Sequence, residues 1–178
     1  TLREHAEKAL HLLGEQGRHC DSFTPSKDSH VSSDQSTARV QLSLDTDAGP
    51  LTMTLDPAFA PVAVARVVGL ARAGFYDGIA VHRVVPGFVA QFGDPSGDGY
   101  GGDGQPSLRC ETSPLPFLSG SVGVALSGRD SGSSQLFVTL GRYPHLDGQY
   151  ALIGQAGPGW DKLSAGDRIV HARVGAVP

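Results

Sequence analysis

One arginine and two glutamines stand in strand-like stretches of the sequence, each close to bulky apolar residues. Arg83 and Gln91 flank Phe88, and Gln135 precedes Phe137 by two positions. Because side chains alternate between the two faces of a strand, the three polar side chains can converge while their neighbours enter a core. An apolar cleft with a few polar points is typical of a ligand site. Taken one at a time, however, these residues fit a surface cation and aromatic core filler better.

A glycine-rich stretch at 97–102 matches the Gly-x-Gly-x-x-Gly spacing of dinucleotide-binding folds. That motif requires a helix directly after it, whose N-terminus receives the pyrophosphate. Here the residues 103–106 are Asp-Gly-Gln-Pro, which does not favour a helix start. Asp94, Asp98 and Asp103 would also repel phosphate. We therefore interpret the stretch as a structural loop.

Other motifs of metal and nucleophile chemistry are missing from the sequence. The aspartates near residue 98 lack the spacing of a calcium loop, and no glutamate closes their run. Seven histidines and two cysteines occur, but neither Cys-x-x-Cys nor His-Glu-x-x-His is present. Gly-x-Ser-x-Gly is absent as well. We therefore expect no metal and no cofactor.

Length and composition favour one turn-rich β domain with a short appendage. The chain has 178 residues, and its 24 glycines and 12 prolines separate short apolar runs. Only 18% of the residues are charged, so a coiled coil or charge-rich disorder fits poorly. A net charge of −4 argues against nucleic-acid binding. No apolar run is long enough for a membrane span, so we expect a soluble chain that binds no membrane.

The two cysteines leave the compartment open. Cys20 and Cys110 are compatible with a disulfide and equally with two thiols in a reducing cell. Because the first residue is Thr1, we expect a processed or excised fragment, from either a cytoplasmic or an exported protein.

Three segments are predicted along the chain. Residues 1–17 carry an apolar stripe typical of an amphipathic helix, which resembles the last helix of a HEAT-type repeat; a capping helix of the same domain is the alternative. Residues 18–37 are polar and without periodicity, which predicts a flexible linker. Residues 38–175 form the globular domain.

Within that domain the sequence predicts about eight strands and one clear helix. The alternation of 39–44 and 49–55 indicates a hairpin, and Pro61 and Gly74 bound a helix over 61–73. A short second helix is expected near 160–163. Eight short strands favour a closed barrel, because closure removes exposed edges. The six further strands are expected at 81–85, 88–92, 121–126, 135–140, 151–153 and 168–174.

Taken in order, five strings resemble the bacterial-like cyclophilin family of peptidyl-prolyl cis-trans isomerases, over about residues 38–174. The resemblance implies a closed eight-stranded antiparallel barrel capped by two helices. It also implies isomerisation of X–Pro bonds in proline-containing peptides or unfolded proteins, by a monomer that assists folding. The strings are Phe75–Gly78, His82–Asp94, Gly120–Ser127, Ser133–Val138 and Leu146–Gly154.

By motif position, the resemblance implies specific roles for residues of this chain. The catalytic group comprises Arg83, Phe88 and Gln91. Val89 stands where the family has a pocket methionine, and His145 where it has a tryptophan on which cyclosporin binding depends. We therefore expect weakened affinity for cyclosporin. The implied substrate-binding residues are His82, Val89, Ala125, Leu126, Gln135, Phe137, His145, Leu146 and Tyr150.

Rotation about an X–Pro bond makes and cuts no covalent bond, so it requires neither a nucleophile nor a proton shuttle. An always-protonated guanidinium such as that of Arg83 is a suitable hydrogen-bond donor to the prolyl nitrogen of the twisted amide.

Two other hypotheses for the function remain. One is a scaffold module that holds proline-containing segments with little turnover. The other is a hydrolase built around His82 or His145, for which a bell-shaped pH profile is expected.

Overall fold

The computed structural model describes residues 38–177. The predicted helix of residues 1–17, its HEAT-type resemblance and the linker of residues 18–37 therefore lie outside the described residues. Cys110 is buried in the long loop before the fifth strand. A disulfide between Cys110 and Cys20 was one of the two states expected from the sequence, but Cys20 lies outside the described residues.

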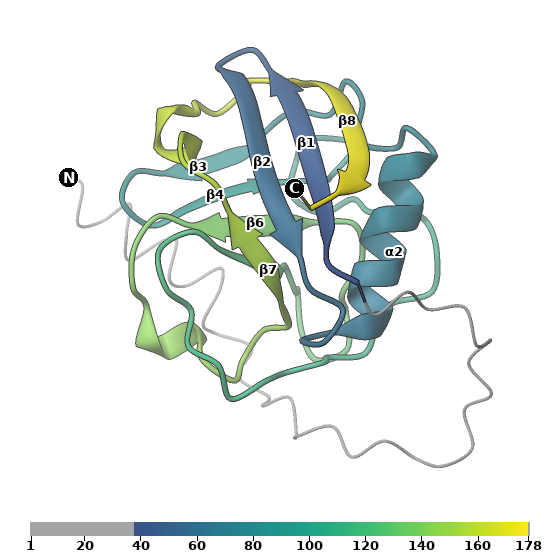
Figure 1. Ribbon diagram of the computed structural model, residues 1–178, viewed down its shortest axis with the longest axis vertical. Helices are drawn as coiled ribbons and strands as arrows, with labels where there is room; N and C mark the ends of the chain where they lie inside the picture. Colours follow the sequence, from purple (N-terminus) through teal and green to yellow (C-terminus); the bar gives the residue numbers. More distant parts are fainter. Residues whose placement is uncertain (1–37, 178) are drawn as a thin grey trace.

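Eight strands form one antiparallel sheet in the order β3-β4-β6-β5-β7-β2-β1-β8 (Figure 1). β1 and β2 form the predicted hairpin, with alternate residues buried as their apolar spacing requires. All residues of β5 and β6 are buried, so these strands lie at the centre of the domain. The strands are β1 (Val40–Thr46), β2 (Gly49–Leu55), β3 (Arg83–Val85), β4 (Val89–Phe92), β5 (Ser121–Val124), β6 (Leu136–Thr139), β7 (Leu152–Ala156) and β8 (Ile169–Ala176).

The closed barrel predicted from the sequence is wrong. β3 and β8 stand at the two ends of the sheet and are not hydrogen-bonded neighbours, so the described strands curl into an open half-barrel. An isolated bridge between Ala80 and Arg168 and a few backbone hydrogen bonds between residues 78–81 and 166–169 join the chain before β3 to the start of β8. β3 has three residues, and the chain before it turns at Gly78, where φ is 78°. Because of this turn, too few extended residues lie next to β3 to form a longer hydrogen-bonded ladder with β8.

The described residues contain one α-helix, α2 (Pro61–Arg72), which packs beside β8 (Figure 1). Its bounds confirm the predicted helix, with Pro61 at the first helical position. The second predicted helix is only a 3₁₀ turn, η2 (Trp160–Lys162). A further 3₁₀ turn, η1 (Pro144–Leu146), carries two of the predicted site residues.

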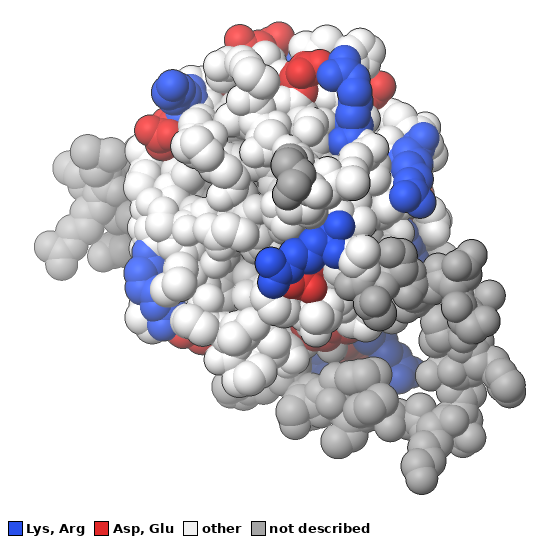
Figure 2. Space-filling view, viewed as in Figure 1, with Lys and Arg blue, Asp and Glu red and all other residues white. Residues whose placement is uncertain are grey.

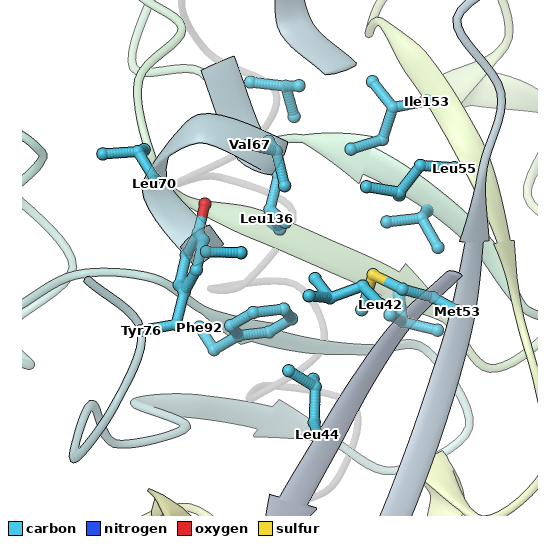
Figure 3. Close-up of a cluster of buried hydrophobic side chains, with 14 of the residues drawn as sticks. Leu42, Leu44, Met53, Leu55, Val67, Leu70, Tyr76, Phe92, Leu136 and Ile153 are labelled. Carbon is cyan, nitrogen blue, oxygen red and sulfur yellow. The ribbon is translucent and has the colours of Figure 1, made fainter. Parts of the chain in front are cut away.

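The main core lies between α2 and the sheet (Figure 3). Phe92, which stands where the cyclophilin family has a glycine, is fully buried in this core. Its ring lies 5.7 Å from that of Trp160 and 6.0 Å from that of Tyr76. The residue labels in Figure 3 mark Leu42, Leu44, Met53, Leu55, Val67, Leu70, Tyr76, Phe92, Leu136 and Ile153.

One face of the molecule has no single charged patch (Figure 2). On the face shown in Figure 2, basic and acidic side chains are scattered rather than gathered in one patch. Among the described residues, no helix combines the length and the apolar character needed to cross a membrane.

A distant carboxylate caps the start of α2. The N-cap residue is Ala60, and no side chain of the helix's own first turn closes it. Glu111, which is buried, accepts hydrogen bonds from the N–H groups of Val62 at 3.1 Å and Ala63 at 2.7 Å. These are two of the donors that a helix start leaves open, and the helix dipole favours a negative charge there. Burial raises the pKa of Glu111, although the two hydrogen bonds oppose that rise.

Replacing Glu111 by Ala is expected to lower the free energy of unfolding by about 1–2 kcal/mol, because buried donors lose their partner. Denaturant titration at pH 7 measures this loss. The exposed carboxylate of Asp161 supplies the control: Asp161→Ala also removes one negative charge and should change stability by less than about 0.5 kcal/mol. Equal effects of the two changes would contradict the cap.

The same carboxylate predicts a pH dependence of stability. Its pKa is higher in the folded chain than in the unfolded chain, so the folded state holds the proton more tightly. The stabilisation that comes from this tighter proton binding is fully present below the ordinary pKa of glutamate. It is lost as the pH rises through the pKa of Glu111 in the folded chain. The difference in free energy of unfolding between the wild type and Glu111→Gln should therefore change between the unfolded-state and folded-state pKa values of Glu111. Above the folded-state pKa this difference should no longer depend on pH. A constant difference from about pH 4 to pH 8 would contradict the raised pKa.

Candidate active site

The register of three neighbouring strands brings the predicted polar residues together. Arg83 of β3 pairs with Gln91 of β4, and Gln91 pairs with Phe137 of β6. Directly paired residues point to the same face of a sheet, so these three side chains form a row across the strands. Arg83 and Gln91 therefore converge as alternation suggested, and Gln135 joins them through a hydrogen bond with Gln91 at 2.8 Å.

A pocket opens along this row. Its apolar walls belong to a second buried cluster, separate from the main core, which includes Val89, Phe117, Phe137 and Leu146. The pocket is lined by Arg83, Val89, Gln91, Phe137, Leu146 and Tyr150. All six are residues that the sequence singled out. Five of them come from β3, β4, β6 and η1, and Tyr150 lies four residues after the end of η1.

A chain of amide hydrogen bonds leads to the arginine. The Nη1 atom of Arg83 donates to Oε1 of Gln91 at 3.3 Å, and Nε2 of Gln91 donates to Oε1 of Gln135 at 2.8 Å. The second terminal nitrogen of Arg83, Nη2, is buried and has no hydrogen-bond partner among the described residues. A buried donor without a partner costs about 1–3 kcal/mol, so this N–H group is available to a ligand.

The charge states in the pocket follow from burial. Burial lowers the pKa of Arg83, while the nearby Tyr150 has the opposite, smaller effect. The ordinary arginine pKa lies so far above neutrality that the guanidinium stays protonated. Burial also raises the pKa of the Tyr150 phenol, and the charge of Arg83 offsets part of that rise. The pocket therefore presents one fixed cation and one neutral hydroxyl at neutral pH.

His82 lies behind the pocket rather than in its lining. Both of its ring nitrogens are buried without a partner among the described residues. The ring lies against Gly99, where a Cβ would come within 3.7 Å of Cδ2. Burial lowers the pKa of His82, although Asp94 opposes the shift. Its imidazole is therefore neutral at pH 7.

The remaining predicted residues surround the pocket. Phe88 is half-buried, with its ring 4.6 Å from that of Tyr143 and 5.9 Å from that of His145. His145 is exposed in η1. Ala125 and Leu126 belong to the same apolar cluster, and the Ala125 N–H donates to the carbonyl of Gln135 at 2.9 Å. The structure thus brings all twelve predicted site residues to one region, and six of them line the pocket. The six outside the lining are His82, Phe88, Ala125, Leu126, Gln135 and His145.

Sequence reasoning missed the residues that hold the pocket wall. Arg142 donates two hydrogen bonds to the carboxylate of Asp147, which in turn accepts the N–H of Phe117 at 2.7 Å. Phe117 stacks on Phe137 with ring centres 5.6 Å apart. The Arg142–Asp147 pair therefore fixes η1, and with it Leu146, against the loop that carries Phe117. The one sequence signal for these residues is that Asp147 lies within Leu146–Gly154, one of the five strings that resemble the cyclophilin family.

A metal centre is not evident at this site. Among residues 38–177, no three His, Cys, Asp or Glu side chains are grouped so that they would hold an ion. The lining offers one cation, one amide and one phenol among apolar walls. Such a lining suits a neutral, partly apolar ligand that accepts a hydrogen bond.

The comparisons with known proteins agree with this geometry. Residues 40–172 match the family model described as Cyclophilin type peptidyl-prolyl cis-trans isomerase/CLD. The chain is 38% identical over 139 residues to a peptidyl-prolyl cis-trans isomerase of Synechococcus elongatus, covering 75% of this chain and 95% of that protein. It is 39% identical over 133 residues to peptidyl-prolyl cis-trans isomerase B of Bacillus subtilis, covering 72% and 92%.

The fold agrees as well. A crystal structure of a cyclophilin type peptidyl-prolyl cis-trans isomerase of Cryptosporidium parvum superposes with a TM-score of 0.72 at 24% identity, covering 79% of this chain and 99% of that one. At that identity the likeness speaks for the fold alone. Together with the family model and the bacterial relatives, it confirms the resemblance found in the sequence: the chain belongs to the cyclophilin-type peptidyl-prolyl cis-trans isomerase family.

Proposed function

We propose that this peptidyl-prolyl cis-trans isomerase turns over its substrates in the pocket lined by Arg83, with the guanidinium as the catalytic donor. The single observation that carries the proposal is the buried Nη2 atom of Arg83, which no acceptor of the described residues uses. Arg83 is also one of the residues that line an apolar pocket of the kind that would hold a proline ring. The substrates are proline-containing peptides and unfolded proteins, whose folding the reaction assists.

The reaction is limited by amide resonance. Rotation about the X–Pro bond faces a barrier of about 18–20 kcal/mol because the planar amide must be broken. In the twisted state the prolyl nitrogen regains its lone pair and accepts a hydrogen bond, which the planar isomers do not. A donor that binds this state better than either planar isomer lowers the barrier. A charge-assisted hydrogen bond contributes about 1.5–3 kcal/mol, or roughly ten- to a few-hundred-fold in rate.

The apolar walls of the pocket bind the substrate in this proposal. Val89, Phe137 and Leu146 line the pocket and Phe88 stands at its rim, so these side chains would hold the proline ring. Their removal of water from the amide also favours the less polar twisted state. Gln91 keeps one Nε2 proton beyond its bond to Gln135, and we assign it to the flanking backbone of the substrate.

The rim residues set specificity in this proposal. The backbone of Ala125 and Leu126 runs beside the bound peptide, and His145 and Tyr150 border it. His145 replaces the tryptophan of the family resemblance, so affinity for cyclosporin is weakened. One solved cyclophilin of Cryptosporidium parvum was determined in the presence of the dipeptide Ala-Pro, which is the ligand class proposed for this pocket.

The catalytic unit in this proposal is the domain of residues 38–175, working as a monomer. The family match over residues 40–172 supports that boundary.

Arg83→Ala is expected to lower kcat about ten- to a few-hundred-fold, because the twisted amide loses its donor. Arg83→Lys should recover only part of the loss, since an ammonium lacks the planar fork that reaches both Gln91 and the substrate. NMR exchange on an Ala-Pro peptide measures the rates. Arg173→Ala, which removes an exposed cation paired with Asp45, is the matched control. Full activity in Arg83→Ala would reject the proposal.

The activity should be constant from about pH 6.5 to pH 8.5. The pKa of Arg83 is lowered by burial but starts far above this range, and the pKa of His82 is lowered below it. Neither Arg83 nor His82 therefore changes charge across this range. Rates of one peptide across this range test the point. A bell-shaped profile would favour the hydrolase hypothesis built on His82 or His145, as would cleavage products in the mixture.

Gly123 lies where any side chain would push into the pocket wall. A Cβ there would come 2.4 Å from Cζ of Phe137 and 2.9 Å from Cε1 of Phe117. Gly123→Ala is therefore expected to displace the Phe137 ring and raise KM about tenfold, since about 1.4 kcal/mol of lost binding corresponds to that factor. Gly175→Ala in β8, with nothing within 4 Å of its Cβ, is the control. An unchanged KM in Gly123→Ala would contradict the placement of Phe137.

A further inference from the structure

The glycine-rich loop of residues 94–104, which the proposed function leaves unused, is tied to the active site at its middle. The carboxamide nitrogen of Gln135 donates to the carbonyl of Gly99 at 2.9 Å and to that of Gly101 at 2.8 Å. A carboxamide has two N–H donors, so both protons of Gln135 are used by the loop. Gln135 therefore has no donor left for a substrate, and its orientation is fixed by two carbonyl oxygens.

That orientation determines the orientation of the next amide. If Gln135 were flipped, its oxygen would face two carbonyl oxygens, which is unfavourable. The Gln135 oxygen must instead face Gln91 and accept its Nε2 proton. Gln91 in turn must direct its own oxygen toward Nη1 of Arg83. The loop carbonyls thus set the direction of every hydrogen bond up to the guanidinium.

Two buried aspartates hold the loop itself. Asp94 accepts the N–H of Ser96 at 2.9 Å and of Gly99 at 2.6 Å. Burial alone raises the pKa of Asp94, but the hydrogen bonds from Ser96 and Gly99 outweigh it and hold the pKa well below its usual range. This carboxylate therefore stays ionised and keeps the first half of the loop closed.

Asp103 holds the far end of the loop. Its side chain is fully buried and pairs with Nη1 of Arg66, on α2, at 2.7 Å. It also accepts the hydroxyl of Ser133 at 2.8 Å. Since Ser133 stands two residues before Gln135, this contact joins the loop to the segment just before β6 that carries Gln135. Arg66 further donates to the carbonyl of Pro106 at 3.1 Å.

We propose that the loop of residues 94–104 orients the guanidinium of Arg83 through Gln135 and Gln91, with Asp103 and Arg66 as positioning residues. The inference rests on the proposed catalytic role of Arg83. Because the oriented donor acts on the twisted amide and not on the planar substrate, loss of its orientation should lower kcat and leave KM nearly unchanged.

Asp103→Asn tests the proposal directly, because it keeps the shape of the side chain and removes the charge that holds Arg66. The expected result is a kcat lower by about 2- to 30-fold with KM within about twofold of the wild type. The matched control is Asp45→Asn, which removes the partner of Arg173 on β1 and β8. It should change neither parameter. An unchanged kcat in Asp103→Asn would overturn the proposal.

A second readout separates positioning from general destabilisation. In ¹⁵N NMR spectra, the side-chain N–H signals of Arg83 should shift or broaden in Asp103→Asn and stay unchanged in Asp45→Asn. If Asp103→Asn does not fold, Ser133→Ala removes one bond to the same carboxylate and should show the same two effects more weakly. Loss of kcat with unchanged Arg83 signals would mean that the loop does not act through the guanidinium.

A double-mutant cycle tests the route. If the loop acts through the amide of Gln135, Asp103→Asn should have little further effect on kcat in a Gln135→Ala background. Additive losses would overturn the proposed route.

The failure of this inference is also distinguishable from failure of the proposed function. If Arg83→Ala abolishes turnover while Asp103→Asn does not affect it, the catalytic role of Arg83 stands and the positioning role of the loop falls.

Discussion

The half-buried side chain of Arg83, with its buried Nη2 atom, is the constraint on which the rest of the site depends. A charged group that leaves water must be paired or hydrogen-bonded, yet the Nη2 atom of Arg83 has no partner among the described residues. Gln91 satisfies the neighbouring Nη1 atom and holds the fork in place. The fold thus tolerates the cost of one unsatisfied donor in a pocket whose proposed ligand supplies the missing acceptor.

The sheet explains how short strands achieve this placement. β3 has three residues, which is enough to set Arg83 opposite Gln91 but not enough to close the sheet against β8. The central strands β5 and β6 are buried throughout and keep the pocket wall rigid. The row of Arg83, Gln91 and Phe137 lies across the β3, β4 and β6 ladder, so it begins at one open edge of the sheet and runs toward its buried centre.

Local patterns in the sequence predicted much of this structure. Alternation and motif order identified Arg83, Gln91 and Phe137, and the helix that begins at Pro61 follows from a proline start and a glycine end. The missing closure of the barrel and the contacts of Glu111 with α2 could not be predicted in this way. Glu111 lies 48 residues from Ala63 along the chain, and no local spacing encodes such a pairing. The contact of Asp147 with the N–H of Phe117 spans 30 residues and could not be predicted for the same reason.

The most direct measurement of the central claim is a crystal structure of the chain with a bound proline-containing peptide. The account predicts the proline ring between Phe137 and Leu146, with Nη2 of Arg83 within hydrogen-bond distance of the prolyl nitrogen. A peptide bound elsewhere on the domain would contradict the account. So would a guanidinium turned away from the bound proline toward solvent.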